Sequence, residues 1–530
     1  MSTMQGKSNQ PPRILVLGAN KESIQYYELL LAQNVHVLAL DCDPVLPQDF
    51  LDRWKDRLTC IKHDFSDHVG AAKLAREYGV THSIAFPVGR ALTALGKIND
   101  ELGLPGASFT AIDTLTHKLK LHKFLESCGI DNYQWIYVPA EKVHSLPSYA
   151  DEIQSSIGYP CIIKPVTGSG SVGVRMIRSA QDLKSYKAPE RFYDDGLLIE
   201  QLLKGDEFSC SLLVDNDGKC HLLGLYFKDI STAPYRQETA YFSENSTAVS
   251  LAREAIMPLM QKLSSSLELR STFLTADVIN SWSGTPYIID CSARLSGNQV
   301  ISLHCFNGNN PMQLYRENVI EGKSISCKLP SRACAIRFFD FTERAVWPEN
   351  APESPMAKAR TSDTAVAFNA SELACIRALN SGMHYTVNSD KSVSNSSDST
   401  PQTELSCVKT SEGVAGNRYS AGKAVGKATG SDSGYEHGTV LSTSHSSCCD
   451  IQSDCCDDVI AASIFNAEEL SHIVTLENYL HRGAEYGPLK TGSDLSSGFI
   501  MVAHDTVTQA DMLALRYLKW LNSHAVSRIA

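Results

Sequence analysis

The stretch from Tyr159 to Gly173 constrains the fold of this chain more than any other. A short apolar run, Cys161–Ile163, ends at a single lysine, Lys164, and a loop with three glycines follows before a second apolar run starts at Val174. Glycines let backbone N–H groups surround phosphate oxygens, and a lysine at the end of a buried strand supplies positive charge. The spacing differs from a P-loop, which places Gly-x-x-x-x-Gly-Lys-Ser/Thr before a helix. The pattern predicts a strand, a glycine hairpin and a strand, closing either on a phosphate or on no ligand.

Residues 13–112 carry a strand–helix alternation that predicts a Rossmann-like α/β domain. Residues 13–20 form a buried-strand pattern with a glycine turn at Gly18, residues 22–33 have helical spacing, and Val35–Asp41 is a second strand that ends on an acidic residue. The turn lacks Gly-x-Gly-x-x-Gly, so we expect a scaffold that need not bind a dinucleotide. The further expected elements are strands at Thr59–Ile61 and His82–Pro87 and helices over 68–78, Ala91–Leu102 and 110–128.

The run Leu197–Leu203 places one carboxylate, Glu200, between apolar residues, and Glu207 follows seven residues later. An apolar connector with a polar residue at its centre is suited to hold a flat heterocycle and to hydrogen-bond its edge. A buried strand with one carboxylate at its edge is the alternative, and this run alone leaves both open. The expected elements before it are a strand at Trp135–Val138 and a helix over 148–157.

Two aspartates occupy corresponding places in two expected antiparallel strands. Asp277 lies within Phe273–Ile279, Asp290 ends Tyr287–Asp290, and a turn cluster separates the strands. Pairing would bring the carboxylates together, and adjacent carboxylates repel unless a cation such as Mg²⁺ lies between them. Arg294 adds a fixed cation for a phosphoryl group or a substrate carboxylate. Aspartates that face solvent at strand ends are the alternative. The neighbouring expected elements are strands at Phe208–Val214 and His221–Phe227 and a helix over 246–268.

Residues 386–456 are rich in Ser, Thr, Gly, Lys and Asp. This composition cannot bury enough apolar surface to order itself, so we expect a disordered linker. Its pairs Cys448-Cys449 and Cys455-Cys456, with His445 nearby, lack zinc-finger spacing, which favours free thiols over a metal site. On either side we expect a small α/β subdomain over 331–385, with Ala333–Phe338 as a strand and the segment Ala365–Cys375, and a continuation over 457–530 with an amphipathic helix at Ala510–Leu521.

Charge and composition argue against several classes of protein. The net charge of −11 disfavours broad binding to nucleic acid or to anionic membranes, because both require a basic face. Residues 1–12 are expected to be a flexible N-terminus without a secretory signal, and no apolar run reaches the roughly 18 residues that span a membrane. The 16 cysteines are therefore expected to be reduced thiols, which indicates a cytoplasmic protein.

Taken together, these residues resemble the ATP-grasp superfamily, and within it the carboxylate–amine ligases and carbamoyl-phosphate-synthetase-like enzymes. The resemblance covers roughly residues 13–345, where the separate signals follow the family's order with similar gaps. It implies an ATP-grasp N-subdomain with a glycine lid over 113–205 and a C-subdomain with the metal site over 206–330. The implied fold class is α/β, an α+β grasp with a Rossmann-like domain before it and a disordered insertion near the C-terminus.

The resemblance also implies the roles of the site residues. Lys118 and Lys164 would contact ATP phosphates, and Lys164 and Arg294 would be catalytic. Asp277, Asp290 and Ser292 would hold Mg²⁺, with Mn²⁺ as an alternative. The remaining implied ATP contacts are the lid residues Gly168, Ser169, Gly170, Ser171 and Gly173, the adenine-facing Glu200, Gln201, Leu202 and Leu203, and the ribose-binding Glu207.

The chain departs from the family pattern at the metal site and before the first lysine. His117 stands where the family has aspartate, the metal carboxylates are aspartates where glutamates are usual, and Ser292 replaces asparagine. A shorter carboxylate still binds Mg²⁺ if the strand moves in or water intervenes. We therefore expect an altered site and not necessarily an inactive one.

The implied activity is an ADP-forming ligase that phosphorylates a small-molecule carboxylate with ATP and passes the acyl group to an amine. Two rivals stay open: a bicarbonate-using carboxylase or carbamoyl-phosphate-type enzyme, and a non-catalytic ATP-binding sensor. Against the first, the sequence holds no second grasp repeat, glutaminase half or biotin-carrier Met-Lys-Met. The segment Asp229–Glu244 would line the acceptor pocket, with Arg236 holding a carboxylate, or would be an exposed loop. The sequence leaves a homodimer open.

Overall fold

The computed structural model describes residues 11–20, 23–87, 91–187, 195–348 and 465–527, which belong to one compact unit. Several expectations lie outside these residues. They are the flexible N-terminus up to residue 10, the segment Ala365–Cys375, the linker 386–456 and the cysteine pairs beside His445.

The N-terminal domain is a four-stranded parallel sheet in the order β3-β2-β1-β4. Alternate residues of the central strand β1 enter two different cores: Ile14 and Val16 pack on one face, Leu15 and Leu17 on the other. A strand buried on both faces is apolar throughout, as the sequence indicated. The elements are β1 (Arg13–Leu17), α1 (Ile24–Leu31), β2 (His36–Asp41), α2 (Gln48–Trp54), β3 (Leu58–Lys62), α3 (His68–Tyr78), β4 (His82–Ile84) and α4 (Ala91–Leu102).

The glycine turn after β1 is bonded within the domain. Gly18 adopts a left-handed φ of 103°, and its carbonyl accepts a hydrogen bond from the hydroxyl of buried Tyr27. The Asp41 carboxylate accepts from the Ala19 N–H at 2.6 Å. Asp41 is the residue that a dinucleotide fold would offer to a ribose, and here it is already bonded to the turn. These contacts support the interpretation of the domain as a scaffold.

The expected helix over 110–128 is wrong, because the structure contains two helices, α5 (Phe109–Thr116) and α6 (Lys118–Ser127). His117 between them has an extended backbone, with φ −108° and ψ 101°, and its ring accepts from the Lys120 N–H as an N-cap. The Lys118 N–H donates to Val166 at the base of the glycine loop. The break therefore fixes Lys118 at the start of a helix, beside the loop.

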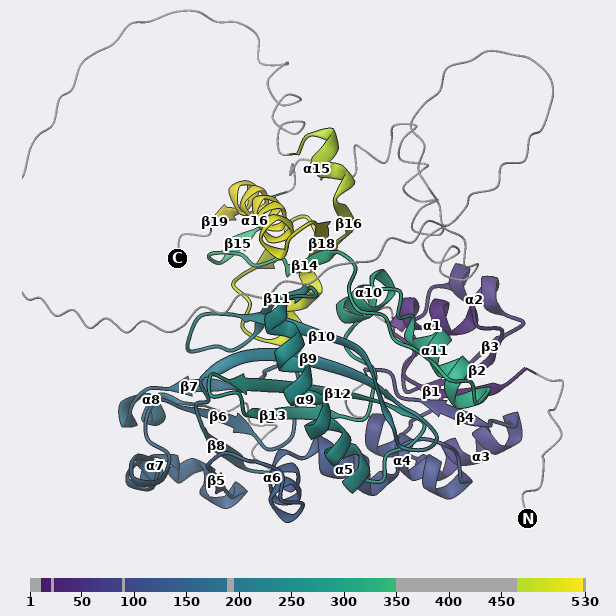
Figure 1. Cartoon of the computed structure of the whole chain (residues 1–530), viewed down its shortest axis with the longest axis horizontal. Helices are drawn as coiled ribbons and strands as arrows, with labels where there is room; N and C mark the ends of the chain where they lie inside the picture. The colour runs from purple at the N-terminus through teal and green to yellow at the C-terminus, as the bar shows by residue number, and fades with distance from the viewer. Residues whose placement is uncertain (1–10, 21–22, 88–90, 188–194, 349–464, 528–530) are drawn as a thin grey trace, which may run out of the picture. The chain divides into compact units, whose positions relative to one another are not determined.

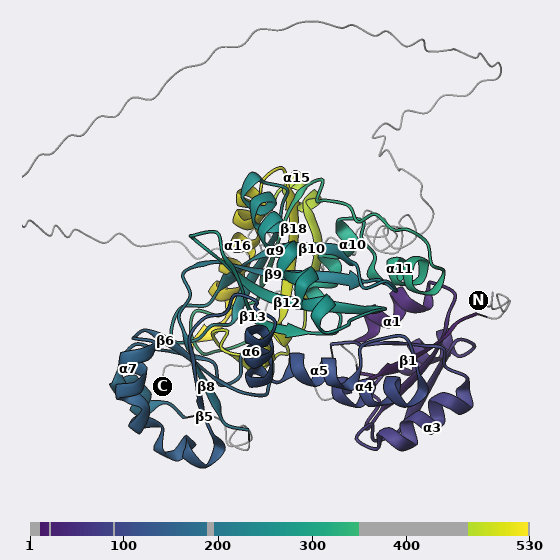
Figure 2. The same cartoon turned by 60° about the horizontal axis from the view of Figure 1, so that its bottom comes forward.

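A small antiparallel sheet in the order β5-β8-β6-β7 carries the glycine loop between β6 and β7. Cys161 pairs with Ile177 and Ile163 with Arg175, which confirms the predicted hairpin. One face of this sheet packs on the neighbouring helices, α7 and α8 in Figure 1 and α7 in Figure 2. The elements are β5 (Trp135–Val138), the 3-10 segment Ala140–Tyr149, α7 (Ala150–Ser156), β6 (Cys161–Pro165), β7 (Arg175–Ile177), α8 (Ala180–Ser185) and β8 (Leu197–Gln201).

The large sheet has eight strands in the order β13-β12-β9-β10-β11-β14-β18-β16. Its strands are antiparallel, and α9 crosses the face formed by β9, β10 and β12 (Figure 1). The elements are β9 (Gly205–Val214), β10 (Cys220–Ile230), β11 (Glu238–Ser243), α9 (Thr247–Ser266), β12 (Thr272–Ser281), β13 (Pro286–Ser292), α10 (Asn298–Phe306), α11 (Pro311–Tyr315), the π-helical segment Arg316–Ile320 and β14 (Ala333–Phe338).

The C-terminal residues complete this same sheet. Strand β18 (Gly498–His504) pairs with β14 along its whole length, and β16 (Ile473–Asn478) pairs with β18. Helix α16 (Val507–His524) packs its buried face, including Tyr517, against the core around Phe339. The remaining elements are β15 (Ala345–Val346), α15 (Ala467–Ser471), β17 (Glu485–Tyr486), the 3-10 segment Gly492–Ser497 and β19 (Val526–Ser527), with β17, β15 and β19 in a separate sheet.

Within the described ranges, none of the helices combines the length and the apolar character that crossing a bilayer would require.

Candidate nucleotide-binding site

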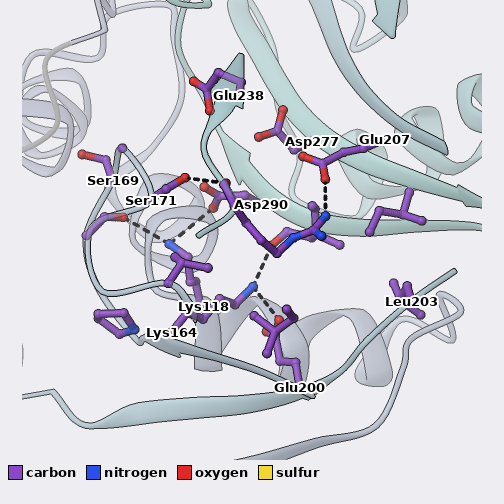
Figure 3. A pocket seen from close by; sticks show the side chains of 18 of the residues that line it. Lys118, Lys164, Ser169, Ser171, Glu200, Leu203, Glu207, Glu238, Asp277 and Asp290 are labelled. Carbon is purple, nitrogen blue, oxygen red and sulfur yellow. Dashed lines mark hydrogen bonds and ion pairs between the residues drawn. The ribbon is translucent and has the colours of Figure 1, made fainter. Parts of the chain in front are cut away.

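A cavity lies where the small sheet with its glycine loop faces the strands β9, β10, β12 and β13 of the large sheet. Figure 3 shows Lys118 directed towards Asp290 of the large sheet and Lys164 beside Glu200 of the small sheet. The sequence-predicted residues that line it are Lys118, Lys164, Gly168, Ser169, Gly170, Ser171, Glu200, Gln201, Leu202, Leu203, Glu207, Asp277 and Asp290. The structure thus gathers residues that lie up to 172 positions apart, since Lys118 and Asp290 are both in the wall.

Lys164 and Glu200 form a buried ion pair at the floor of the cavity. The two residues are on the paired strands β6 and β8, and Lys164 Nζ lies 2.8 Å from Glu200 Oε2. Lys164 Nζ also donates to the Ile289 carbonyl of β13 at 2.9 Å, and so links the small sheet to the large one. His122 donates from Nε2 to the other Glu200 oxygen at 2.7 Å.

These partners hold Glu200 in its charged form. Burial alone would raise the pKa of Glu200, but the Lys164 ammonium and the His122 hydrogen bond bring it down from 4.5 to about 2. A carboxylate that stays ionised can accept hydrogen bonds only, as the exocyclic amine of an adenine would require. Strand β8 thus carries a carboxylate that is both buried and ionised. This position is compatible with either interpretation of the sequence, a contact to a flat heterocycle or a carboxylate on a buried strand.

We expect this ion pair to give the protein a measurable acid dependence. Because the folded-state pKa of Glu200 lies below the unfolded value, its stabilisation is present above about pH 4.5 and is lost as the pH falls towards 2. Relative to wild type, Glu200→Gln lacks this contribution, so the difference in unfolding free energy should shrink by about 2 kcal/mol between about pH 6 and about pH 3. Denaturant titrations at several pH values measure it. A constant difference would contradict the low pKa.

Lys118 contacts both the glycine loop and β13, the strand that carries Asp290. Its ammonium is nearly buried, donates to the Gly168 carbonyl at 3.1 Å and lies 3.5 Å from Asp290 Oδ1. His122 lies one helical turn after Lys118 on α6, so both face the cavity side. The break at His117 matters for both residues, because it makes Lys118 the first residue of α6 and places it at the cavity.

Two cations and two carboxylates form a second ion-pair network at the large sheet. Lys228 of β10 is 5% exposed, and its Nζ lies 2.9 Å from Asp277 Oδ2 and 3.0 Å from Glu207 Oε1. Arg236 donates to the other Glu207 oxygen at 2.9 Å. Burial opposes ionisation of Glu207, but Lys228 and Arg236 keep its pKa below the ordinary value. The ribose carboxylate of the prediction is thus held in an ion-pair network.

The pKa of Asp277 is shifted in the opposite direction from that of Glu207. Burial raises its pKa, the negative charges of Glu207 and Glu238 add to this effect, and Lys228 opposes it. Glu238 begins β11 and also lines the cavity, so this corner has more carboxylates than cations (Figure 3). Surplus negative charge favours a bound cation at this corner.

Asp277 and Asp290, the two aspartates predicted to bind a metal, are direct register partners. Asp277 of β12 pairs with Asp290 of β13, as the sequence predicted, next to a register shift that follows Asp277. In the described part of the chain, no three His, Cys, Asp or Glu side chains are arranged to hold a metal ion alone. Mg²⁺ commonly uses one or two carboxylates together with substrate phosphates. The two aspartates therefore fit an ion that arrives with a nucleotide.

Three predicted residues lie away from the cavity wall. Ser292 pairs with Thr275 further along β13, and the Gly173 carbonyl accepts from the Tyr186 hydroxyl behind the loop. Arg294 donates from its guanidinium to the Leu295 carbonyl at 2.6 Å, at the junction with the N-terminal domain, where the Leu295 N–H donates to Ala85. The predicted roles of Ser292, Gly173 and Arg294 remain predictions.

Two residues of the site were missed in the sequence. Lys228 had the same signal as Lys164, a single lysine within a β-like apolar run. His122 had the four-residue spacing from Lys118 on one helix. Glu238 lies within the segment Asp229–Glu244, which was expected to line the acceptor pocket or to be an exposed loop, and it lines the cavity.

Residues 124–269 match the protein-family profile described as D-ala D-ala ligase C-terminus. The D-alanine–D-alanine ligase of Marinobacter nauticus is 32% identical over 126 residues, which are 23% of this chain and 37% of that protein. The D-alanine–D-alanine ligase of Xylella fastidiosa is 25% identical over 197 residues, 35% of this chain and 54% of that protein. The chain thus spans about a third to a half of these curated relatives.

Among solved structures, an L-amino acid ligase from Bacillus licheniformis has a TM-score of 0.60 at 15% identity, with 98% of each chain covered. The N5-carboxyaminoimidazole ribonucleotide synthetase from Thermotoga maritima has a TM-score of 0.56 at 12% identity, covering 96% of this chain and 98% of that one. These identities show the fold alone. They confirm the predicted fold class, a Rossmann-like domain followed by the ATP-grasp sheets.

Proposed function

We propose that this chain is an ATP-grasp enzyme, an ADP-forming ligase that joins a small-molecule carboxylate to an amine; its fold and the matching family profile support the proposal. The observation that carries the proposal is the facing arrangement in the cavity. Lys118 and Lys164 lie on the small-sheet side, and Asp277 and Asp290 are paired in register on the large-sheet side. Such an arrangement matches the charges of a metal–nucleotide complex, in which phosphates need cations and the metal needs carboxylates.

The nucleotide would lie along the floor of the cavity. Glu200 and the connector Gln201–Leu203 would receive the adenine, and Glu207 the ribose. Lys118 and Lys164 would contact phosphate oxygens, with Lys228 as a third cation on the opposite wall. The glycine loop would cover the phosphates and exclude water. These assignments are supported by the positions of the residues in the wall.

In the first step, a carboxylate oxygen of the substrate attacks the γ-phosphorus of ATP, and the bond from that phosphorus to the β–γ bridging oxygen breaks. ADP and an acylphosphate result. The lysines offset the charge that develops on the phosphoryl oxygens. A Mg²⁺ held by Asp277 and Asp290 would neutralise phosphate charge and fix the orientation of the phosphates.

In the second step, the amine nitrogen attacks the acyl carbon, the bond to the phosphate oxygen breaks, and the nitrogen loses a proton as the amide forms. Inorganic phosphate leaves. The family resemblance assigns Arg294 to the negative charge on the acyl oxygen or the departing phosphate, and for this role its guanidinium would have to leave the Leu295 carbonyl and turn towards the cavity. The chain supplies positioning and charge, so no covalent enzyme nucleophile is required.

Amino acids are the substrate class that we test first, because a carboxylate and an amine occur in one molecule. With Mg-ATP, phosphate release should rise at least about tenfold above background when matching amino acids are supplied, and the product mass should equal the two substrates minus water. Release that depends on bicarbonate instead would favour the carboxylase. Nucleotide binding without stimulated release under any of these conditions would favour the sensor.

A further inference from the structure

We propose that residues 489–497, which follow β17 and lead into β18, are a positioning element that holds the glycine loop closed over the nucleotide site. The inference deepens the proposed function and rests on it for the identity of the ligand. Its geometric content, that a C-terminal segment fastens the loop, stands on contacts within the described chain. We call residues 489–497 the docking segment.

The docking segment touches the glycine loop through backbone alone. The Gly492 N–H donates to the Gly170 carbonyl at 2.6 Å. A Cβ on Gly492 would lie 2.8 Å from the Gly170 Cα, a separation at which one of the two backbones must shift. Two glycines therefore meet where neither position has room for a side chain. Gly170 belongs to the cavity wall, so the contact acts directly on the loop that covers the site.

The docking segment is itself fastened to the large sheet. The buried Leu489 donates its N–H to the Asp340 carboxylate just beyond β14, at 2.9 Å. The Asp494 carboxylate accepts from the N–H groups of Lys490 and Thr491, which fixes the turn that presents Gly492. Because β14 and β18 belong to the large sheet, the loop of the small sheet is tied to the opposite wall of the cavity.

A second bridge runs beside the first, through the connection between β10 and β11. The Tyr235 ring lies between two cations: the Arg175 guanidinium, 4.0 Å from its centroid, and the Lys490 ammonium, 5.4 Å away. Arg175 begins β7, directly after the glycine loop, and Lys490 belongs to the docking segment. Cation–π contacts of this kind stabilise by about 0.5–1 kcal/mol at exposed sites. The middle of the loop and the strand that follows it are thereby both held to segments that connect strands of the large sheet.

The cavity under the fastened loop is small. Its volume of about 120 Å³ is below the roughly 300–1,000 Å³ typical of ligand pockets. If the loop moves to admit a nucleotide, the Gly170–Gly492 contact must break. We infer that the docking segment sets the equilibrium between the closed loop and an open one, and therefore the rate at which nucleotide leaves.

The test compares Gly492→Ala with Gly487→Ala in the full chain. Neither glycine has a left-handed φ, and a Cβ at Gly487 would meet only the Arg344 side chain, at 4.0 Å. Gly487→Ala therefore makes the same chemical change just outside the docking segment. Hydrogen exchange of the backbone over residues 166–174, measured without nucleotide, should accelerate by about tenfold in Gly492→Ala and stay at the wild-type rate in Gly487→Ala.

A second readout is the dissociation of a fluorescent ATP analogue, which should be about tenfold faster from Gly492→Ala than from wild type. Thermal unfolding with the same midpoint as wild type shows that the variant folds. If exchange over 166–174 is the same in both variants, the positioning role is refuted. If exchange accelerates but wild type does not bind the analogue, the docking contact stands and the proposed function fails.

Discussion

Replacing Asp290 with alanine is expected to abolish ATP-dependent phosphate release while the fold is retained. Asp290 would be one of two protein ligands of the metal, and its side chain is 44% exposed with Lys118 as its ion-pair partner at 3.5 Å. Lys118 would lose this ion pair but keep its hydrogen bond to the Gly168 carbonyl, and the pair is long and half exposed on the Asp290 side, so we expect a small loss of stability. Losing the metal ion that Asp290 would hold removes positive charge from the phosphates, which costs about a hundredfold or more in rate.

The experiment measures steady-state phosphate release and the melting temperature of Asp290→Ala side by side. Asp217→Ala is the matched control, since Asp217 is an exposed aspartate in the turn between β9 and β10 and is not in the cavity wall. The control should match wild type in both measurements. Undiminished turnover in Asp290→Ala would refute the metal assignment, and a large loss of stability would mean that Asp290 has a structural role.

Replacing Lys164 with methionine is expected to have the largest combined effect on stability and on nucleotide binding. Glu200 is 3% exposed, and its carboxylate would be left with the hydrogen bond to His122. Breaking a buried ion pair by removing one member typically destabilises by about 3–5 kcal/mol. The link from Lys164 Nζ to the Ile289 carbonyl is lost as well, so the two walls of the cavity lose a direct hydrogen bond.

The double variant Lys164→Met with Glu200→Gln separates the two effects. Neutralising Glu200 removes the unpaired buried charge, so the double variant should recover part of the lost unfolding free energy. It should not recover nucleotide affinity, because the cation for the phosphates is still absent. Denaturant unfolding and isothermal titration with Mg-ATP measure the two quantities. Recovery of affinity together with stability would show that Lys164 only supports the fold.

The local patterns of the sequence were reliable wherever one strand or helix decides the geometry. The glycine hairpin after Lys164 formed as expected, since two short apolar runs flank a loop that contains three glycines. The pairing of Asp277 with Asp290 also followed from the sequence, because a short turn between two strands fixes which residues lie opposite each other. Each of these predictions depends on neighbours close in the chain.

The expectation of one helix over 110–128 shows where such reasoning stops. Residues 109–127 have a continuous helical pattern, and nothing local demands an extended residue at His117. The break is favoured by a distant contact, the hydrogen bond from the Lys118 N–H to Val166 at the base of the glycine loop. In a single continuous helix, the Lys118 N–H would donate to a carbonyl of the preceding turn. In the structure it donates to Val166, so a tertiary hydrogen bond replaces a helical one.

By itself, the sequence determined the fold class, the glycine loop, the buried lysine and the two aspartates that pair across a turn. The tertiary structure alone decided which distant groups meet: Lys228 and Glu238 beside Asp277, and Gly492 against Gly170. The physical reason is the range of the interactions involved. Hydrogen bonding and side-chain periodicity within a strand or turn depend on residues that are close in the sequence. Ion pairs and backbone contacts between sheets depend on how separate segments pack. The glycine loop is therefore visible in the sequence, but the segment that fastens it is not.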